Sequence, residues 1–316
     1  MQKLEKESEK LTFAIIGTGA LGGYYGARLL SAGEEVFFQI RTGCDDVLKN
    51  GLSIKSCRGD LFFPKIKAFP KTSQMPKADV IIVALKTTAN GLLKEMLTPL
   101  LKENSLVILL QNGLGYEEKL AQELPNVAIA AGISYICAEK KGPGQIVHYD
   151  LGNLAFALLK PNEKATKLLQ KVREAFLKAG VETAITENFL ELRWKKLVWN
   201  VPYNGLAVVL KTTTDKINAN PAARALCLDL MREVKLGAAA YGVKIEDSYL
   251  EKMLSLSDNM LPYAPSMRVD YDSQREMEIE GIYTNPIAAA AAKGVKLEKM
   301  QVLEQELLFC QSQYGK

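Results

Sequence analysis

The chain has 316 residues, of which 48% are hydrophobic and 24% charged, and its formal net charge is +4. This length accommodates two domains with well-filled cores, and the composition is that of an ordinary soluble globular protein. The mild charge, without long runs of one sign, argues against a nucleic-acid or membrane-surface partner, and no apolar run approaches the roughly 20 residues that a membrane span needs.

The chain opens with alternating acids and bases, MQKLEKESEK, which predicts a solvated tail over residues 1–10 rather than a signal peptide. The cysteines are widely spaced, without a CxxC pair, and predict reduced thiols that mostly fill core volume in a cytoplasmic protein. They are Cys44, Cys57, Cys137, Cys227 and Cys310. The single histidine, His148, argues against a zinc cluster, so no metal is expected.

Strand and helix patterns alternate through residues 11–187. A strand, a glycine turn and a helix ending at Gly33 come first, and a second strand follows at 34–41. A hairpin is expected around Gly59, and a helix is expected to follow the strand at 78–87 and to end at about Leu101. Nearly continuous apolar strands at 78–87 and 105–113 are typical of a parallel sheet buried on both faces. The order predicts a doubly wound α/β domain of the Rossmann type.

From residue 188 to residue 316 helical periodicity dominates, which predicts an all-helical second domain. One helix is expected to follow Asn220 as N-cap, with Pro221 in its first position, and to end at Gly242. Further helical segments are expected at 246–257, 269–283 and 297–313. Such a domain can form a homodimer or cap a cleft, and the sequence leaves this choice open.

A GxGxxG turn joins the first strand to the first helix, formed by Gly17, Thr18, Gly19, Ala20, Leu21 and Gly22. Gly17 allows the tight turn, Gly19 lets the backbone approach a pyrophosphate, and Gly22 lets helix and strand pack closely. The helix N-terminus then faces the anion. Because the motif stands between a strand and a helix, it predicts a dinucleotide site rather than a turn without a ligand.

The end of the second strand indicates which dinucleotide binds. NAD-binding chains usually carry an acid there for the ribose 2′-hydroxyl, but residues 38–42 contain no acid and one arginine, Arg41. A guanidinium matches a 2′-phosphate in charge and geometry, so NADP is predicted. Lys86, at the carboxyl edge of the sheet, could also reach a phosphate or be simply solvated.

The segment RWKKLVWNVPYN places Lys196, Asn200 and Asn204 four residues apart, on one face of a helix and beside apolar residues. Reducing a carbonyl group with a dinucleotide requires a hydride at the carbonyl carbon and a proton for the alkoxide. A lysine ammonium can polarise the carbonyl and then donate that proton, and His148 has no evident partner for this work. From the residues alone, two interpretations of Lys196 are equally good: a proton donor, or a surface lysine like its neighbour Lys195.

Six segments together resemble the ketopantoate reductase (2-dehydropantoate 2-reductase) family. They are AIIGTGALGGYYGARL, FFQIR, VIIVALKT, LLQNGLG, WKKLVWNVPYNGL and PSMRVDYDSQREMEIE, in family order across almost the whole chain. The resemblance implies an NADPH site at the glycine turn, with Arg41 at the adenosine phosphate and Lys86 near the cofactor. It also implies that Asn112 lies at the nicotinamide and the substrate.

The same resemblance implies roles for residues of the second domain. Lys196 corresponds to the catalytic lysine, and Asn200 and Asn204 to amides that contact the substrate. Ser266 corresponds to a serine that holds the substrate carboxylate, and Glu278 to a glutamate that contacts its hydroxyl. Two further matching residues are assigned to structural support: Asp270 and Arg275.

The chain departs from the family pattern after Glu278, where Tyr283 and Thr284 stand in place of a common Asn-Gly. Three functions therefore stay open: a reductase of 2-dehydropantoate or of another branched 2-oxo acid, a β-hydroxyacid or 6-phosphogluconate type dehydrogenase, and a non-catalytic NADP sensor. The QNG and PSMRVD elements favour the first, which yields pantoate for pantothenate and coenzyme A synthesis. The polar stripe formed by Lys196, Asn200 and Asn204 argues against the sensor, because burying polar groups that have no ligand to bind is energetically costly.

Overall fold

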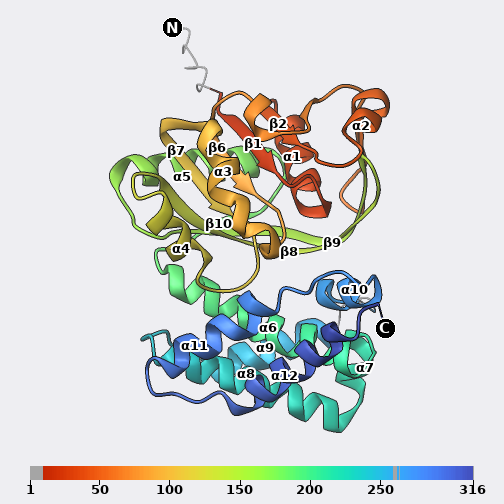
Figure 1. The fold of residues 1–316 in the computed structure, drawn as a ribbon, viewed down its shortest axis with the longest axis vertical. Helices are drawn as coiled ribbons and strands as arrows, with labels where there is room; N and C mark the ends of the chain where they lie inside the picture. The colour runs from red at the N-terminus through yellow and green to blue at the C-terminus, as the bar shows by residue number, and fades with distance from the viewer. Residues whose placement is uncertain (1–9, 259–261, 263, 316) are drawn as a thin grey trace, which may run out of the picture. The chain divides into compact units, whose positions relative to one another are not determined.

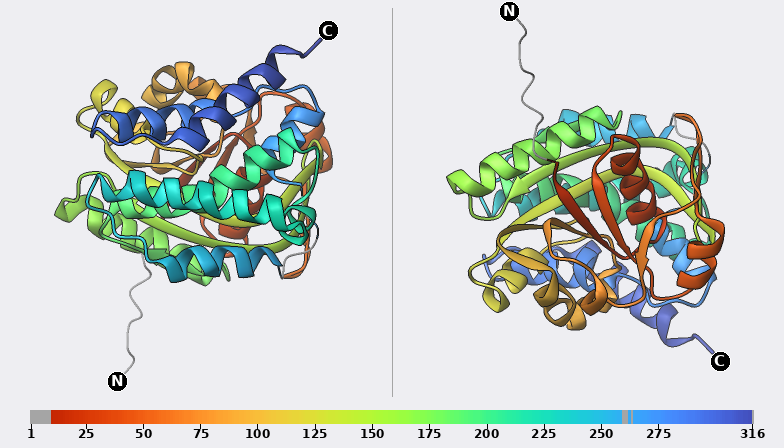
Figure 2. Two further views of the ribbon diagram at one scale, coloured as in Figure 1. Left: turned by 90° about the horizontal axis from the view of Figure 1, so that it is seen from below. Right: turned by 90° about the horizontal axis from the view of Figure 1, so that it is seen from above.

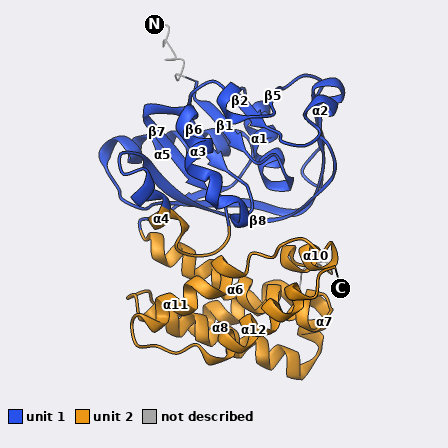
Figure 3. Ribbon diagram, in the orientation of Figure 1, with its two compact units in different colours: residues 1–111, 120–187 blue, residues 112–119, 188–316 orange. Residues whose placement is uncertain are grey.

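The computed structural model describes residues 10–258, 262 and 264–315. The expected solvated tail therefore lies, except for Lys10, outside the described residues. The chain divides into two compact units (Figure 3). Unit 1 comprises Met1–Gln111 and Leu120–Glu187, and unit 2 comprises Asn112–Lys119 and Asn188–Lys316. Residues 112–119, expected within the α/β domain, thus group with the helical unit.

Unit 1 is built on a ten-stranded mixed sheet (Figure 1). The strands are β1 (Thr12–Ile16), β2 (Glu35–Gln39), β3 (Leu52–Ser56), β4 (Leu61–Phe63), β5 (Lys67–Phe69), β6 (Ala78–Val83), β7 (Leu101–Leu109), β8 (Ala128–Gly142), β9 (Gln145–Leu158) and β10 (Thr183–Ile185). Their order is β4-β3-β9-β8-β7-β6-β1-β2-β5, with β10 also paired to β9. The run from β5 to β8 is parallel, and β8 and β9 are antiparallel. The α/β prediction is confirmed.

Helices cover the sheet on both sides. They are α1 (Ala20–Ser31), α2 (Cys44–Asn50), α3 (Leu93–Leu97) and α5 (Glu163–Lys178), with 3₁₀ turns at Thr72–Gln74, Thr87–Leu92 and Thr98–Leu100. Helix α4 (Tyr116–Glu123) begins in unit 2 and ends in unit 1. In the right-hand view of Figure 2, α5 and the short helices between β6 and β7 lie on opposite sides of the strands. Tyr25 of α1 and Phe176 of α5 pack edge to face, with ring centroids 6.0 Å apart, inside the core of this unit.

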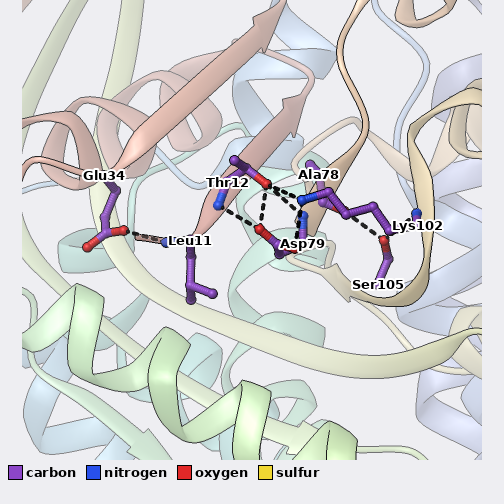
Figure 4. Close-up of polar contacts among 7 residues, drawn as sticks. All are labelled: Leu11, Thr12, Glu34, Ala78, Asp79, Lys102 and Ser105. Atoms are coloured by element: carbon purple, nitrogen blue, oxygen red, sulfur yellow. Dashed lines mark hydrogen bonds and ion pairs between the residues drawn. The ribbon is translucent and has the colours of Figure 1, made fainter. Parts of the chain in front are cut away.

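A polar clamp ties the starts of β1, β6 and β7 together (Figure 4). The glycine turn follows the opposite end of β1. Thr12 donates its hydroxyl to Asp79 Oδ2 at 2.6 Å, and its backbone N–H donates to the same oxygen at 3.0 Å. Lys102 Nζ donates to Asp79 Oδ1 at 2.7 Å. Burial alone raises the pKa of Asp79, but the hydrogen bonds from Lys102 and Thr12 outweigh burial and hold that pKa below its ordinary value.

Replacing Asp79 by alanine is expected to lower the free energy of unfolding by about 1–3 kcal/mol at neutral pH, because three donors lose a charged acceptor. A lowered pKa in the folded state stabilises the fold above the ordinary value of 3.8, and this contribution is lost as the pH falls through the folded-state pKa. Urea denaturation of both proteins over a pH series measures the difference. A difference in the free energy of unfolding that stayed constant from neutral pH to below the folded-state pKa of Asp79 would rule out the clamp.

Unit 2 is helical (Figure 1). Its helices are α6 (Phe189–Val209), α7 (Thr214–Ala219), α8 (Pro221–Ala239), α9 (Asp247–Asp258), α10 (Ser266–Asp272), α11 (Asn285–Ala291) and α12 (Glu298–Ser312), with a π-helical turn at Glu280–Thr284. The left-hand view of Figure 2 shows the long helices side by side. Asn220 caps α8 as predicted, accepting from the N–H groups of Ala222 and Ala223 at 3.0 Å.

Helix α6 lies at the centre of this unit and packs against α8, α10 and α12. Trp194 is fully buried, and Gly237 of α8 makes room for it. A Cβ atom at Gly237 would lie 2.8 Å from Trp194 Cη2. The missing side chain therefore lets the two helices approach closely around the largest buried ring of the unit.

Two helical expectations were wrong in detail. Residues 269–283 do not form one helix, because α10 ends at Asp272 and Gln274 adopts a left-handed backbone with φ of 50°. The N–H of Arg275 donates to Asp270 O at 2.8 Å, and that of Gln274 to Tyr271 O at 3.0 Å, which closes the helix end. The segment 86–101 is two 3₁₀ turns around a short α3, with Pro99 in the second turn.

All five cysteines are free thiols, and Cys44, Cys137 and Cys227 are buried. Cys57 is exposed and Cys310 is partly buried. Among the described residues, no helix combines the length and the apolar character required to cross a membrane.

Candidate functional site

The glycine turn of unit 1 has one open position between two crowded ones. Gly17 has φ of +89°, and a Cβ atom there would lie 2.7 Å from Leu85 N. A Cβ atom at Gly22 would lie 2.2 Å from Gly17 O. At Gly19, which caps the N-terminus of α1, an added Cβ would meet no atom within 4 Å. The turn thus leaves space at a helix N-terminus, where backbone N–H groups favour an anion.

The turn is tied to the end of β2. Thr18 donates its hydroxyl to Gln39 O at 2.8 Å, and its N–H points to the same oxygen at 3.3 Å. Gln39 is the last residue of β2, so Arg41 follows it closely, and the Arg41 side chain is exposed. Lys86 is also exposed, just beyond the end of β6. Both cations therefore stand at the carboxyl ends of parallel strands, the edge where such sheets bind ligands.

Lys196, Asn200 and Asn204 all lie on α6, as the periodicity predicts. Lys196 is half-buried, whereas Asn200 and Asn204 are 3% and 2% exposed. Two buried side-chain amides require hydrogen-bond partners, because a polar group that is removed from water without one costs about 1–3 kcal/mol of stability. Both have them within unit 2, and these partners connect the helix to other predicted residues.

Asn200 is bonded to Asn112. Its Nδ2 donates to Asn112 Oδ1 at 3.2 Å, although 88 residues separate the two. The loop that carries Asn112 is also held by the segment after Glu278. The N–H of Leu114 donates to Gly281 O at 3.0 Å, and Asn285 Nδ2 donates to Leu114 O at 2.8 Å. These contacts explain why residues 112–119 group with the helical unit.

A buried ion pair anchors the same loop to α6. Arg193 Nη2 contacts Glu117 Oε1, and their side chains are 2% and 0% exposed. Burial raises the pKa of the Glu117 carboxyl, and the Arg193 guanidinium opposes that rise. Arg193 stands one turn before Lys196, and Glu117 five residues after Asn112, so the pair fixes the two polar segments against each other. Arg193 opens the segment RWKKLVWNVPYN, but no sequence pattern indicates that it pairs with Glu117.

Asn204 connects α6 to α10. Its Oδ1 accepts the N–H of Met267, at a long 3.4 Å. Ser266, the first residue of α10, precedes Met267 and has an exposed side chain. The predicted serine therefore stands next to the group that Asn204 holds. Glu278 is 8% exposed and lies just before the π-helical turn.

Asp270 and Arg275 form the pair expected to give structural support. Arg275 Nε donates to Asp270 Oδ1 at 3.0 Å, and Asp270 is 1% exposed. The bond spans the left-handed residue that ends α10, so it stabilises the turn leading to Glu278.

The altered segment after Glu278 serves packing. Tyr283 is fully buried and donates its hydroxyl to Val201 O at 2.7 Å, between the two asparagines of α6. Gly205 makes this possible, since a Cβ atom there would lie 2.4 Å from the Tyr283 hydroxyl oxygen. Thr284 is exposed and donates to Glu304. The sequence comparison had marked these two residues as departures without indicating what they contact.

His148 is a structural residue in unit 1. Its Nε2 lies 3.0 Å from Asp150 O and its Nδ1 2.8 Å from the Ser56 hydroxyl. A carbonyl only accepts, so Nε2 donates and Nδ1 accepts from Ser56. Burial lowers the pKa of His148, which keeps the ring neutral. Both nitrogens are occupied within the α/β unit.

A doubly wound sheet with an open glycine turn, followed by a helical unit that carries a lysine among buried amides, defines a nicotinamide-dependent oxidoreductase. Residues 13–161 match the family described as ketopantoate reductase PanE/ApbA, and residues 188–308 match its C-terminal part. The chain belongs to the ketopantoate reductase family, whose members are NADP-dependent oxidoreductases acting on CH–OH groups.

Individual relatives span nearly the whole chain. A 2-dehydropantoate 2-reductase of Nostoc sp. is 43% identical over 300 residues, covering 94% of each chain. A crystal structure of 2-dehydropantoate 2-reductase from Geobacter metallireducens superimposes with a TM-score of 0.91 at 35% identity, covering 95% of this chain and 99% of the other. One from Methylococcus capsulatus has a TM-score of 0.86 at 26% identity, covering 97% and 98%.

Proposed function

We propose that the chain reduces 2-dehydropantoate to pantoate with NADPH, a step of pantothenate and coenzyme A biosynthesis. The observation that carries the proposal is the polar stripe of α6, with a lysine and two buried asparagines, bonded through Asn200 to Asn112. The similarity to 2-dehydropantoate 2-reductases over 94% of the chain supports the substrate. A cytoplasmic location and a homodimer stay predictions, compatible with five free cysteines and with exposed Val302 and Phe309 on α12.

The residues of unit 1 fit NADPH. The open space at Gly19 and the N-terminus of α1 accommodate a pyrophosphate, and Arg41 and Lys86 offer cations at the carboxyl edge of the sheet. In the proposal Arg41 holds the 2′-phosphate, with Asn112 at the nicotinamide. When bound, NADPH supplies the hydride for C2 of the substrate.

Arg41→Ala is expected to weaken binding of NADPH more than that of NADH. A charge-assisted bond to phosphate contributes about 1.5–3 kcal/mol, so the preference should fall about tenfold or more. Nicotinamide fluorescence titrations with both cofactors measure the two Kd values. An equal loss for both would remove Arg41 from the phosphate site.

In the proposed reaction Lys196 donates the proton. Its ammonium polarises the C2 carbonyl, stabilises the developing oxyanion, and transfers a proton to that oxygen. Asn200 and Asn204 add neutral donors whose positions are fixed by Asn112 and by the N–H of Met267. Leu197 and Val201, apolar residues beside the stripe, are fully buried, so water does not reach the side of the stripe that they cover.

Substrate recognition is proposed to use Ser266 and Glu278. The exposed Ser266 hydroxyl can donate to the substrate carboxylate. Ionised Glu278 only accepts, and the terminal hydroxyl is the only donor on 2-dehydropantoate, so the two are natural partners. Tyr283 and Thr284 are engaged with Val201 and Glu304, so the departure from the family pattern leaves this polar set intact.

An analogue without the terminal hydroxyl, 2-oxo-3,3-dimethylbutyrate, should be reduced poorly. Binding it would bury the Glu278 carboxylate without the hydrogen bond that the substrate hydroxyl would donate, costing about 1–3 kcal/mol or more in kcat/KM. In Glu278→Ala the gap between the two substrates should shrink, because the penalised group is gone. Steady-state kinetics with both substrates on both proteins test this. Equal rates in the wild type would point to another branched 2-oxo acid while leaving the reductase chemistry in place.

A further inference from the structure

An aromatic stripe runs beside the polar stripe of α6. Trp199 and Tyr203 each precede one of the buried asparagines by one residue, so they share its four-residue spacing. Their rings stack, with centroids 5.0 Å apart and planes inclined by 28°. The helix therefore presents a paired aromatic surface next to Asn200 and Asn204.

The Trp199 ring is fixed from two sides. Its Nε1–H donates to Ser257 Oγ at 2.9 Å, and Ser257, 1% exposed, donates in turn to Met253 O at 3.0 Å. On the other side Tyr203 is held by its hydroxyl, which donates to Asn218 Oδ1 at 2.7 Å. A ring with a bonded edge and a stacked face has little freedom to rotate.

Lys196 lies over this ring. Its Nζ is 5.9 Å from the centroid of Trp199, near the outer limit of about 6 Å for a cation–π contact. The face of an indole carries partial negative charge and attracts an ammonium. A lysine side chain otherwise samples many rotamers, so a fixed aromatic surface restricts where its ammonium can be.

We infer that Trp199 is a positioning residue that holds the Lys196 ammonium, in its charged form, beside the asparagines of α6. The inference rests on the proposed function, in which Lys196 donates the proton. Only the charged form can donate, so the same contact serves both placement and protonation.

The neighbouring lysine provides a matched control. Lys195 also lies over an aromatic ring, with its Nζ 5.4 Å from the centroid of Tyr249, and it forms an ion pair with Glu191. Lys195 lies on a different face of α6, about 100° around the helix axis from Lys196. Two lysines of α6 thus each lie over an aromatic ring, Trp199 of α6 itself and Tyr249 of α9, and only one of the two lysines is proposed to act on substrate.

The test is a double-mutant cycle on kcat for 2-dehydropantoate reduction. Trp199→Leu should lower kcat by about three- to tenfold, with the Kd of NADPH unchanged, and Trp199→Phe should keep most of the activity because it keeps a ring face. In a Lys196→Ala background, Trp199→Leu should cause no further loss. Tyr249→Leu, the control, should leave kcat unchanged. Ser257→Ala, which frees the ring without shrinking it, repeats the test if Trp199→Leu does not fold.

Two outcomes would overturn the inference. One is that Trp199→Leu, or Ser257→Ala, lowers kcat by the same factor in the wild type and in the Lys196→Ala background. A residue that only fills the core would act equally in both backgrounds. The other is an unchanged kcat in Trp199→Leu while Lys196→Ala is impaired. A wild-type protein that reduces no 2-oxo acid would refute the proposed function itself, and this result is distinguishable from both.

Discussion

Replacing Lys196 by alanine is expected to lower kcat by about 10²-fold or more, while the Kd of NADPH changes little. The reason is that, in the proposed reaction, the ammonium acts on the oxygen that gains charge in the transition state, whereas the residues proposed to bind the NADPH phosphates belong to unit 1. Steady-state kinetics with 2-dehydropantoate and a fluorescence titration with NADPH measure the two quantities separately.

Lys195→Ala is the matched control. Lys195 is bound to Glu191 and lies over Tyr249, so its loss should cost at most about 1 kcal/mol of stability and leave kcat nearly unchanged. If both variants lost kcat equally, the assignment of the proton donor to the face of Asn200 would be contradicted.

Replacing Arg193 by methionine is expected to lower the free energy of unfolding by about 3–5 kcal/mol, because it leaves the Glu117 carboxylate buried without its partner. Burial already raises the pKa of Glu117 and Arg193 opposes the rise, so the variant should favour the protonated acid. The deficit should therefore shrink as the pH is lowered. Urea denaturation of the wild type and the variant at several pH values measures it.

The double variant Arg193→Met with Glu117→Met separates the charge effect from packing. Replacing both partners of a buried ion pair by apolar side chains is often neutral, so most of the lost stability should return. A double variant as unstable as the single one would show that the site depends on the shape of the arginine rather than on its charge.

The features that sequence reasoning recovered are local ones. The glycine turn, the cap at Asn220 and the stripe of Lys196, Asn200 and Asn204 are all encoded by spacings of a few residues. Such spacings determine the face of a helix or the start of one, whatever the rest of the chain does. For this reason they could be predicted without knowing any long-range contact.

The features that were missed depend on distant contacts or on unusual backbone. The grouping of residues 112–119 with the helical unit follows from long-range contacts, among them the ion pair of Arg193 with Glu117, 76 residues apart, and the hydrogen bond of Asn285 to Leu114, 171 apart, and no local pattern encodes them. The end of α10 was missed because a glutamine, Gln274, takes the left-handed position where glycine is the usual signal. Tyr283 was noticed as a departure, yet its role depends on space left by Gly205.

The central claim is that the chain reduces 2-dehydropantoate with NADPH, and the most direct test is turnover by the purified wild-type protein. NADPH and 2-dehydropantoate are mixed with it, the loss of nicotinamide absorbance is followed, and the product is identified by mass. The predicted result is NADPH oxidation matched mole for mole by pantoate, with NADH a poorer donor. No oxidation of NADPH with this substrate, while another 2-oxo acid or a β-hydroxyacid with NADP is turned over, would contradict the claim.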